Sequence, residues 1–436
     1  MRFMAADVAH ATGGRLVGQN AHLSGVSFDS RSLTPGQLFV AVVAERDGHE
    51  YIAAARTAGA GAYLTMREPE GGTAIVVDDT VIALGRLAGW ARRALDARCG
   101  ARTIGITGSV GKTSTKDFIA AALGASLRTT ASAKSLNNDL GVPVTILNAR
   151  DDVEALVLEM GMRGEGEIAR LCRIAEPTIG VVTAVAAAHT ARVGGIDGVA
   201  RAKSELVAAL PAHGVAVLNA DDVRVRAMCD VTAARVITYG AAADADVRVT
   251  SVVLDDLARP TATYEGKFGS VSVSLPVAGA HMAHNAAAAL AVCIACGVDP
   301  VAGAGALPDV TMSAMRMERR RTTNGALVID DSYNANPASM AAALRALSAV
   351  RAERRVAILG VMAELDDSAA EHRRIAELAE SLGIECVAVS APEYGVRTVS
   401  MDEAVAVAGS LRGDDALLVK GSRVAGLDQL VRRVCG

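Results

Sequence analysis

The chain of 436 residues carries 44 Lys and Arg against 48 Asp and Glu, a net charge of -4, and 51% of its residues are hydrophobic. This length corresponds to about three domains of ~150 residues, and the hydrophobic content excludes intrinsic disorder. Nucleic-acid binders usually have a basic excess and aromatic stacking residues, and this chain has neither, since only 3% of its residues are aromatic.

Residues 1–98 alternate short apolar strands with Ala-rich helices, which predicts a small N-terminal α/β domain. Strands are expected at residues 26–31, 37–43 and 74–78, and helices at 51–59 and 81–96. The polar segment 97–102 that follows is typical of a linker.

Residues 99–312 form the longest block. Apolar runs at 103–107, 155–159, 179–185 and 215–219 are separated by helical stretches. This alternation predicts a mostly parallel sheet with helices on both faces. Residues 247–275 instead alternate apolar and polar side chains, which predicts a small antiparallel addition.

The strand and helix alternation restarts in residues 313–436. Strands are expected at 326–330, 356–359, 386–389 and 416–419, with helices at 338–350 and 369–382. The fold class is therefore α/β, with three domains at 1–98, 99–312 and 313–436.

The seven cysteines are an odd number scattered along a long chain, so a disulfide scaffold is not expected. Cys293 and Cys296 lie in the apolar run 286–298, which favours a buried helix over a zinc site. The first residues contain no signal-like apolar stretch, and no apolar run reaches the ~18 residues that span a bilayer. We expect a cytoplasmic protein without membrane insertion.

The strongest local signal is Thr107-Gly-Ser-Val-Gly-Lys-Thr113, which follows an apolar strand and opens a helix. Backbone amides of such a loop favour phosphate oxygens, and glycines let the backbone approach them closely. Lys112 is expected to neutralise phosphate charge and the Thr113 hydroxyl to bind Mg²⁺. Gly108, Ser109, Gly111 and Ser114 complete the predicted nucleotide loop.

Glu159 ends the apolar run 155–159, a position suited to a Mg²⁺ ligand because Mg²⁺ prefers oxygen donors. The guanine signature Asn-Lys-x-Asp occurs nowhere in the chain, which favours ATP over GTP.

The phosphate loop is the first of a series of different short motifs and single residues along the chain. They lie at residues 107–113, 137–143, 159–161, 189, 202–205, 218–222, 281–285, 316, 330–337, 359–365 and 418–423. They stand in the order seen in the Mur ligases, the ATP-dependent amino-acid-adding enzymes of peptidoglycan precursor synthesis. The chain resembles this family over nearly its whole length. The resemblance implies a central P-loop ATPase-like domain, an N-terminal domain for the UDP end of the substrate and a C-terminal Rossmann-like domain.

Residues 331–337, Asp-Ser-Tyr-Asn-Ala-Asn-Pro, resemble the branch of the family that adds D-alanyl-D-alanine to UDP-N-acetylmuramoyl-tripeptide, and residues 28–31 and 47–49 resemble the same branch. The resemblance implies ATP, this tripeptide and this dipeptide as small-molecule substrates, an acyl-phosphate intermediate and a monomer. The Asp-Asn-Pro-Arg signature for diaminopimelate is absent. The third peptide residue, lysine or diaminopimelate, stays open.

By the same resemblance, Lys112, Glu159, His189, Lys203 and Arg316 are the catalytic candidates. Thr113, Glu159, His189 and Lys203 are the metal candidates, with Lys203 carbamylated. Asn285, Arg316 and Asp330 are expected at the nucleotide. The substrate candidates are Ser30, Arg31, His49, Asn137, Asn138, Asn334, Asn336, Lys420, Ser422 and Arg423. Ala184, Ala186 and Ala187 stand where the family often has Asn, Gly and Pro, so the segment before His189 departs from the family pattern.

Two alternatives stay open at this point. One is another ligase of the superfamily, such as the third-residue-adding enzyme or folylpolyglutamate synthase. The other is a nucleotide-dependent switch or binding protein, which would need neither Glu159 and Lys203 nor the Asn334 and Asn336 pair.

Overall fold

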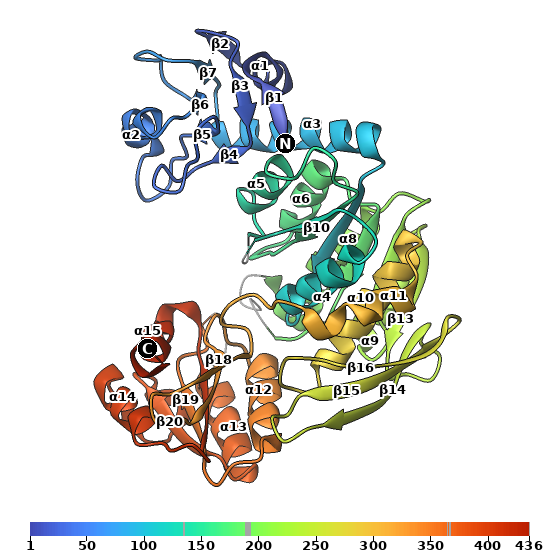
Figure 1. The fold of residues 1–436 in the computed structure, drawn as a ribbon, viewed down its shortest axis with the longest axis vertical. Helices are drawn as coiled ribbons and strands as arrows, with labels where there is room; N and C mark the ends of the chain where they lie inside the picture. Colours follow the sequence, from blue (N-terminus) through green and yellow to red (C-terminus); the bar gives the residue numbers. More distant parts are fainter. Residues whose placement is uncertain (134–135, 188–192, 364, 366–367, 436) are drawn as a thin grey trace.

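The computed structural model describes residues 1–133, 136–187, 193–363, 365 and 368–435. Three sheet-containing parts follow one another along the longest axis of the molecule, in chain order (Figure 1). Their sheets draw strands from residues 2–76, 102–274 and 318–420 respectively. Among the described residues, no helix is long and apolar enough to cross a membrane.

The N-terminal part contains a five-stranded sheet of order β2-β7-β6-β5-β4 and a separate β1-β3 pair. The strands are β1 (Arg2–Met4), β2 (Arg15–Val17), β3 (His22–Ser24), β4 (Val26–Ser27), β5 (Leu38–Val40), β6 (Ala62–Thr65) and β7 (Ala74–Val76). The helices are α1 (Ala5–Thr12), α2 (Ile52–Thr57) and α3 (Thr80–Cys99).

Two expectations for this part need correction. The predicted strand 26–31 stops at Ser27, because the Asp29 carboxylate accepts a hydrogen bond from the Arg31 backbone N–H at 3.0 Å and turns the chain. The predicted linker 97–102 is not a linker, because α3 continues to Cys99 and the next strand already begins at Arg102. Gly100, with φ of 61°, makes the sharp end of α3.

The central part is built on a nine-stranded sheet of order β16-β15-β14-β13-β12-β11-β8-β10-β9. The strands are β8 (Arg102–Thr107), β9 (Thr129–Ala131), β10 (Ala155–Glu159), β11 (Ile179–Val182), β12 (Val215–Asn219), β13 (Arg235–Gly240), β14 (Val247–Leu254), β15 (Pro260–Gly266) and β16 (Gly269–Ser274). Pairing is parallel from β9 through β14. It is antiparallel from β14 to β16, which confirms the predicted antiparallel addition.

The helices of this part are α4 (Lys112–Gly124), α5 (Gly141–Leu147), α6 (Glu167–Ala175), α8 (Gly195–Ala208), α9 (Val223–Arg226), α10 (Met282–Cys296) and α11 (Pro300–Gly305). Alternate residues of β10 enter two different hydrophobic cores, one with α4 and α10 and the other with α3, α5, α6 and α8. Helices therefore cover both faces of the sheet, as predicted.

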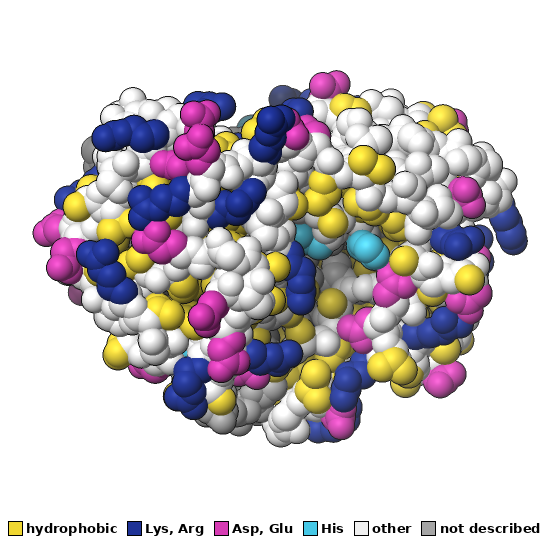
Figure 2. Space-filling view, turned by 90° about the horizontal axis from the view of Figure 1, so that it is seen from below, with side chains coloured by type: hydrophobic (Ala, Val, Ile, Leu, Met, Phe, Trp, Pro, Cys, Tyr) yellow, Lys and Arg dark blue, Asp and Glu magenta, His cyan; other side chains and the backbone are white. Residues whose placement is uncertain are grey.

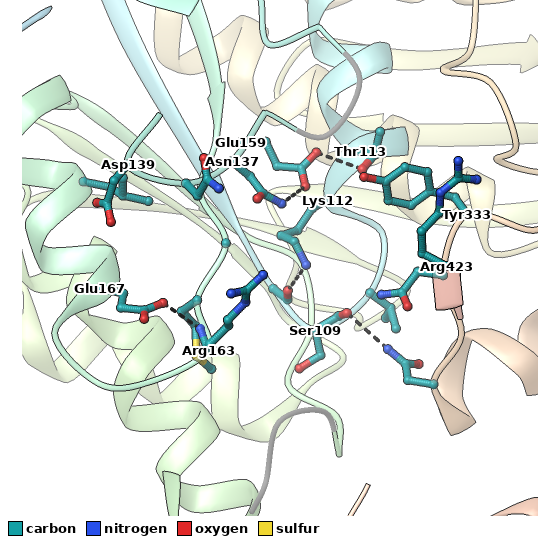
Figure 3. Close-up of a pocket in the computed structure, with 18 of the residues that line it drawn as sticks. Ser109, Lys112, Thr113, Asn137, Asp139, Glu159, Arg163, Glu167, Tyr333 and Arg423 are labelled. Atoms are coloured by element: carbon teal, nitrogen blue, oxygen red, sulfur yellow. Dashed lines mark hydrogen bonds between the residues drawn. The ribbon is translucent and has the colours of Figure 1, made fainter. Parts of the chain in front are cut away.

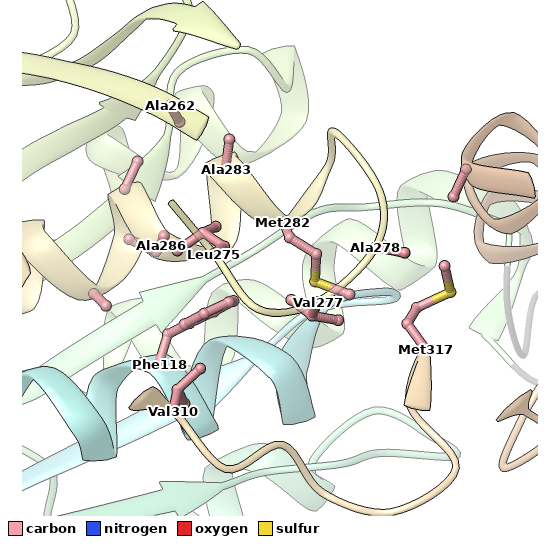
Figure 4. Close-up of a cluster of buried hydrophobic side chains, with 14 of the residues drawn as sticks. Phe118, Ala262, Leu275, Val277, Ala278, Met282, Ala283, Ala286, Val310 and Met317 are labelled. Atoms are coloured by element: carbon pink, nitrogen blue, oxygen red, sulfur yellow. The ribbon is translucent and has the colours of Figure 1, made fainter. Parts of the chain in front are cut away.

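The core between α4 and α10 is shown in Figure 4, where Phe118 lies with Met282, Ala286 and Val310. The small Ala side chains of α10 allow this helix to pack closely on α4. Cys293 and Cys296 are both free and buried on α10. This confirms the prediction that Cys293 and Cys296 lie on a buried helix.

The C-terminal part has a six-stranded sheet of order β17-β18-β22-β19-β20-β21, parallel except for the β17-β18 pair. The strands are β17 (Glu318–Arg321), β18 (Leu327–Asp331), β19 (Arg355–Leu359), β20 (Glu385–Val389), β21 (Thr398–Val399) and β22 (Ala416–Lys420). The helices are α12 (Pro337–Ala349), α13 (Ser368–Ser381), α14 (Met401–Gly409) and α15 (Asp428–Cys435).

Candidate functional site

The glycine-containing loop joins β8 to α4 and exposes the first amides of that helix. Gly108 has φ of 147°, and a Cβ there would lie 1.9 Å from the Thr183 hydroxyl oxygen. Gly111, with φ of 82°, caps α4, which begins at Lys112. Both positions require glycine, because the backbone is left-handed or in close contact. The free amides at the start of α4 favour an anionic group such as phosphate.

Lys112 lies over this loop, with its Nζ donating to the Gly108 carbonyl oxygen at 2.7 Å (Figure 3). Burial lowers the pKa of Lys112, while the negative charge of Glu159 opposes this shift and the positive charge of Arg316 adds to it. A cation held inside a pocket next to free amides is suited to a polyanionic ligand.

Glu159 ends β10 next to the loop and is only 1% exposed. Its Oε2 accepts from the Thr113 hydroxyl at 2.8 Å, and its Oε1 accepts from the Asn137 amide at 2.9 Å (Figure 3). The carboxylate and hydroxyl oxygens form a pair of oxygen ligands that suits Mg²⁺. Among the described residues, no group of three His, Cys, Asp or Glu side chains is placed to hold a metal ion.

Lys203 of α8 borders the same pocket and is 4% exposed. Burial lowers its pKa well below the ordinary value, and the charge of Lys112 lowers it further. His189, the fourth predicted metal ligand, lies outside the described residues.

Lys112, Thr113, Asn137, Glu159 and Lys203 border one cavity of about 610 Å³, to which each part of the molecule contributes. The N-terminal part supplies Val42, Val43, Ala44 and Val81. The central part supplies the loop 108–114 together with Asn137, Asn138, Glu159, Arg163, Arg170 and Lys203. The C-terminal part supplies Arg316, Tyr333, Asn334, Asn336, Ser339, Ala363, Ser422 and Arg423.

The C-terminal lining reaches the phosphate loop directly. Asn336 caps α12 through its Oδ1, which accepts from the Ser339 N–H at 2.9 Å, and its Nδ2 donates to the Ser109 carbonyl oxygen at 3.4 Å. Arg316 stacks over the Tyr333 ring with 4.3 Å from its guanidinium carbon to the ring centre. This stacking orients the guanidinium within the cavity.

One face of the molecule carries charges of both signs (Figure 2). On the face viewed in Figure 2, basic and acidic side chains are interspersed, and the face is hollowed near its centre, where His and basic side chains border the hollow. The described residues of this face therefore offer no extended basic surface to an anionic ligand (Figure 2), whereas the cavity is lined by the cations Lys112 and Arg316.

Comparison with known proteins bears on the identity of this site. Residues 106–293 match the model of the Mur ligase middle domain, and residues 315–423 match that of the Mur ligase, glutamate ligase domain. UDP-N-acetylmuramoyl-tripeptide--D-alanyl-D-alanine ligase of Mycobacterium tuberculosis is 40% identical, over 92% of this chain and 90% of the relative. The chain belongs to the Mur ligase family.

Solved structures agree with this assignment. The crystal structure of MurF from Acinetobacter baumannii has a TM-score of 0.88 at 28% identity and covers 99% of this chain and 98% of that one. A MurF ligase from Thermotoga maritima in complex with ADP has a TM-score of 0.80 at 26% identity, with 94% and 96% covered. The three-part α/β architecture is therefore that of a Mur ligase.

Several predicted residues of this Mur ligase lie at the edge of the cavity or behind it. Lys420 is buried and pairs with Asp331, and its Nζ donates to the Asn334 carbonyl oxygen at 2.9 Å. Burial raises the pKa of Asp330, whose Oδ1 accepts from the Ser332 hydroxyl at 2.6 Å. Asn285 lies against the loop, since a Cβ at Gly111 would be 2.9 Å from its Oδ1. Neither Lys420, Asp330 nor Asn285 lines the cavity.

The predicted residues of the N-terminal domain are not brought to the cavity lining. Arg31 is exposed, and its guanidinium pairs with Asp29 at 2.7 Å. His49 is buried, with Nδ1 at 2.6 Å from Asp47 Oδ1 and Nε2 accepting from the Met66 N–H at 3.0 Å. Both ring nitrogens of His49 thus hold neighbouring loops of its own domain. Ser30 lies in the same loop as Arg31.

Sequence reasoning missed several side chains of the cavity, among them three charged residues and one aromatic residue. Arg163 and Arg170 follow β10, Asp139 pairs with Arg170, and Tyr333 lies beneath Arg316. The two arginines follow Glu159 in the chain, but Glu165 and Glu167 lie between them, so no basic cluster marks them in the sequence. The stacking partner of Arg316 is set by three-dimensional packing and had no local signal.

Proposed function

We propose that this Mur ligase joins D-alanyl-D-alanine to UDP-N-acetylmuramoyl-tripeptide with conversion of ATP to ADP and phosphate. The observation that carries this proposal is the cavity of about 610 Å³ in which the phosphate loop faces lining residues from both flanking domains. One chain therefore supplies surfaces for a nucleotide, for the long UDP-linked tripeptide and for the small amine substrate. We propose boundaries of 1–98, 99–312 and 313–436 for these three domains.

The first chemical step activates a carboxylate. The terminal carboxylate oxygen of the tripeptide attacks the γ-phosphorus of ATP, the bond to the β–γ bridging oxygen breaks, and an acyl phosphate and ADP form. Such a transfer depends on positioning and charge neutralisation. Lys112, the loop amides and Arg316 are the groups that neutralise the developing charge, and the Tyr333 ring holds Arg316 in place.

Thr113 and Glu159 are the residues that would hold Mg²⁺, since their oxygens already lie 2.8 Å apart. Bound Mg²⁺ supplies charge neutralisation at the phosphate oxygens. For Lys203 we propose carbamylation, because burial lowers its pKa and therefore favours the neutral amine that reacts with CO₂. The carbamate would offer anionic oxygens where an ammonium group repels a cation. His189 is retained as the proposed further ligand.

The second step forms the amide bond. The amine of D-alanyl-D-alanine attacks the acyl carbon, the new C–N bond forms, phosphate leaves with its electron pair and the amine loses a proton. Asn334 and Asn336 offer both donors and acceptors to a zwitterionic dipeptide, and Ser422 and Arg423 line the same wall. Lys420 supports this wall from behind through the Asn334 carbonyl.

The UDP end is assigned to the N-terminal domain. Ser30 and Arg31 are exposed enough to contact a diphosphate, and residues 42–44 line the neighbouring part of the cavity. Asn138 lines the cavity between this domain and the loop, where the muramoyl part would lie. We propose a monomer, because one chain completes the cavity, and the cytoplasm as its location, because the reaction consumes ATP.

The test is the joint dependence of phosphate release on both substrates. With ATP and Mg²⁺ present, release should require UDP-N-acetylmuramoyl-tripeptide and D-alanyl-D-alanine together, and the product should contain the pentapeptide. Replacing the dipeptide by L-lysine, diaminopimelate or L-glutamate should give no product. Efficient use of one of these amines would favour another ligase of the superfamily. ATP turnover without either substrate would favour a nucleotide switch.

A further inference from the structure

The segment 360–363 forms part of the cavity wall beside the proposed dipeptide site. It is joined to the β22 end by three hydrogen bonds: Gly360 N–H to the Lys420 carbonyl at 2.8 Å, Ser422 N–H to the Val361 carbonyl at 2.9 Å, and Ala363 N–H to the Ser422 hydroxyl at 2.9 Å. Ala363 and Ser422 both line the cavity. The position of the Ser422 hydroxyl therefore depends on the position of this segment.

His372 of α13 holds the middle of the segment and is fully buried. Its Nε2 lies 2.8 Å from the Met362 backbone nitrogen, and its Nδ1 lies 2.5 Å from the Ser368 carbonyl oxygen. A carbonyl oxygen only accepts, so Nδ1 carries the proton and Nε2 accepts from the Met362 N–H. The imidazole is thus neutral, in one tautomer, with both nitrogens used.

Tyr394 holds the beginning of the same segment. Its hydroxyl donates to the Gly360 carbonyl oxygen at 2.9 Å, and its ring meets the His372 ring edge-on, with the ring centres 4.6 Å apart at 81°. Neither His372 nor Tyr394 lines the cavity. Two buried side chains from outside the site therefore fix both halves of one stretch of its wall.

We propose that His372 and Tyr394 are positioning residues for the incoming dipeptide, because they hold segment 360–363 against Ser422. This inference rests on the proposed function, which places the dipeptide at this wall. The phosphate loop and Lys112 lie at the junction of β8 and α4, and Glu159 ends β10, all in the central part, so we expect the pair to affect ATP binding much less than dipeptide binding.

The test compares His372→Asn, His372→Gln and Tyr394→Phe in steady-state kinetics with each substrate varied in turn. An Asn side chain is too short to accept from the Met362 N–H, whereas a Gln carbonyl oxygen reaches about the position of Nε2. We expect His372→Asn and Tyr394→Phe to raise the KM for D-alanyl-D-alanine about tenfold, the effect of one lost buried hydrogen bond. We expect His372→Gln to stay closer to wild type, and the KM for ATP and for the UDP substrate to change less than about twofold.

Tyr63→Phe is the matched control, because the Tyr63 hydroxyl also donates to a glycine carbonyl, that of Gly71, at 2.9 Å, but in the N-terminal domain. It should leave the KM for the dipeptide unchanged. Equal changes in all three KM values, or a lower melting temperature with unchanged kinetics, would overturn the inference. The proposed function fails separately, if the wild-type protein does not use D-alanyl-D-alanine. The kinetics of the variants would then be measured with the amine that the wild-type protein does use.

Discussion

Replacing Glu159 by Gln removes a charge from the phosphate site and little else. The Glu159 carboxylate accepts one hydrogen bond at each oxygen, from Thr113 and from Asn137. A Gln carbonyl can still accept from the Asn137 amide, and its NH₂ can donate to the Thr113 oxygen, since a hydroxyl both donates and accepts. We therefore expect Glu159→Gln to fold normally and to keep the shape of the site.

The expected loss of activity follows from the burial of this carboxylate. A carboxylate and a positive unit charge about 4 Å away attract each other by about 1 kcal/mol in water. At the effective dielectric constant of about 20 found inside proteins, the same attraction is about 4 kcal/mol. Glu159 is 1% exposed, so the larger figure applies. A loss of about 4 kcal/mol in the transition state corresponds to a roughly 1000-fold lower rate. We expect kcat/KM to fall by at least about 100-fold.

The assay is phosphate release with saturating UDP-N-acetylmuramoyl-tripeptide and D-alanyl-D-alanine and varied ATP and Mg²⁺. Glu154→Gln is the matched control, because Glu154 directly precedes the same strand at its other end and binds the Arg128 N–H at 2.9 Å. This control should keep wild-type activity. A Glu159→Gln enzyme that keeps more than about a tenth of wild-type kcat/KM would refute the reasoning. So small a loss of activity is what the removal of a charge screened by water would give.

Three further predictions follow from single contacts. Asn148→Ala removes both hydrogen bonds, each 2.9 Å, that join this side chain to the Val26 backbone across the first domain boundary. We expect a destabilisation of about 1–3 kcal/mol and faster hydrogen exchange at the Val26 amide, and unchanged exchange would contradict this. Gly108→Ala places a Cβ 1.9 Å from a hydroxyl oxygen at φ of 147°, so calorimetry should show ATP binding weakened at least about tenfold. The Arg31 guanidinium and, second, the Arg31 backbone N–H lower the pKa of Asp29 from 3.8 to about 2. In Arg31→Ala an NMR titration should give a higher pKa for Asp29 than in the wild type, because only the backbone hydrogen bond remains. The stability that the pair contributes above pH 3.8, and loses as pH falls toward 2, should therefore decrease.

The apolar strands and the phosphate loop could be predicted from the sequence with good accuracy. The runs 155–159 and 215–219 became β10 and β12 with the same bounds, because uninterrupted apolar runs between polar residues describe buried parallel strands. The position of Glu159 beside the loop followed from this, since β10 pairs with β8 and both end at the same edge of the sheet.

Other elements had no such signal. The strand β17 reads Glu-Arg-Arg-Arg and pairs only along the sheet edge, so no hydrophobic pattern marks it. The strand β6, Ala62–Thr65, follows an Ala-rich helix and two glycines that conceal where it begins. His49 is expected at the substrate only from the family resemblance of residues 47–49. Its partner Asp47 is a near neighbour in the chain, but the Met66 N–H that donates to its other ring nitrogen is 17 residues away and has no local signal in the sequence.

The position of Arg316 shows why residue types can be predicted when distances cannot. Its neighbours Met315 and Met317 both have left-handed backbones, with φ of 59° and 53°, a strain of about 1–3 kcal/mol each that persists only where surrounding contacts fix it. On one side the Asp117 carboxylate of α4 accepts from the Ser313 N–H at 2.8 Å. On the other, the Met317 N–H donates to Asp331 at 3.2 Å. The connection between domains is thereby fixed both to the phosphate-loop helix and to the C-terminal sheet. Arg316 and Lys112 reach one cavity because these contacts, distant in sequence, act together.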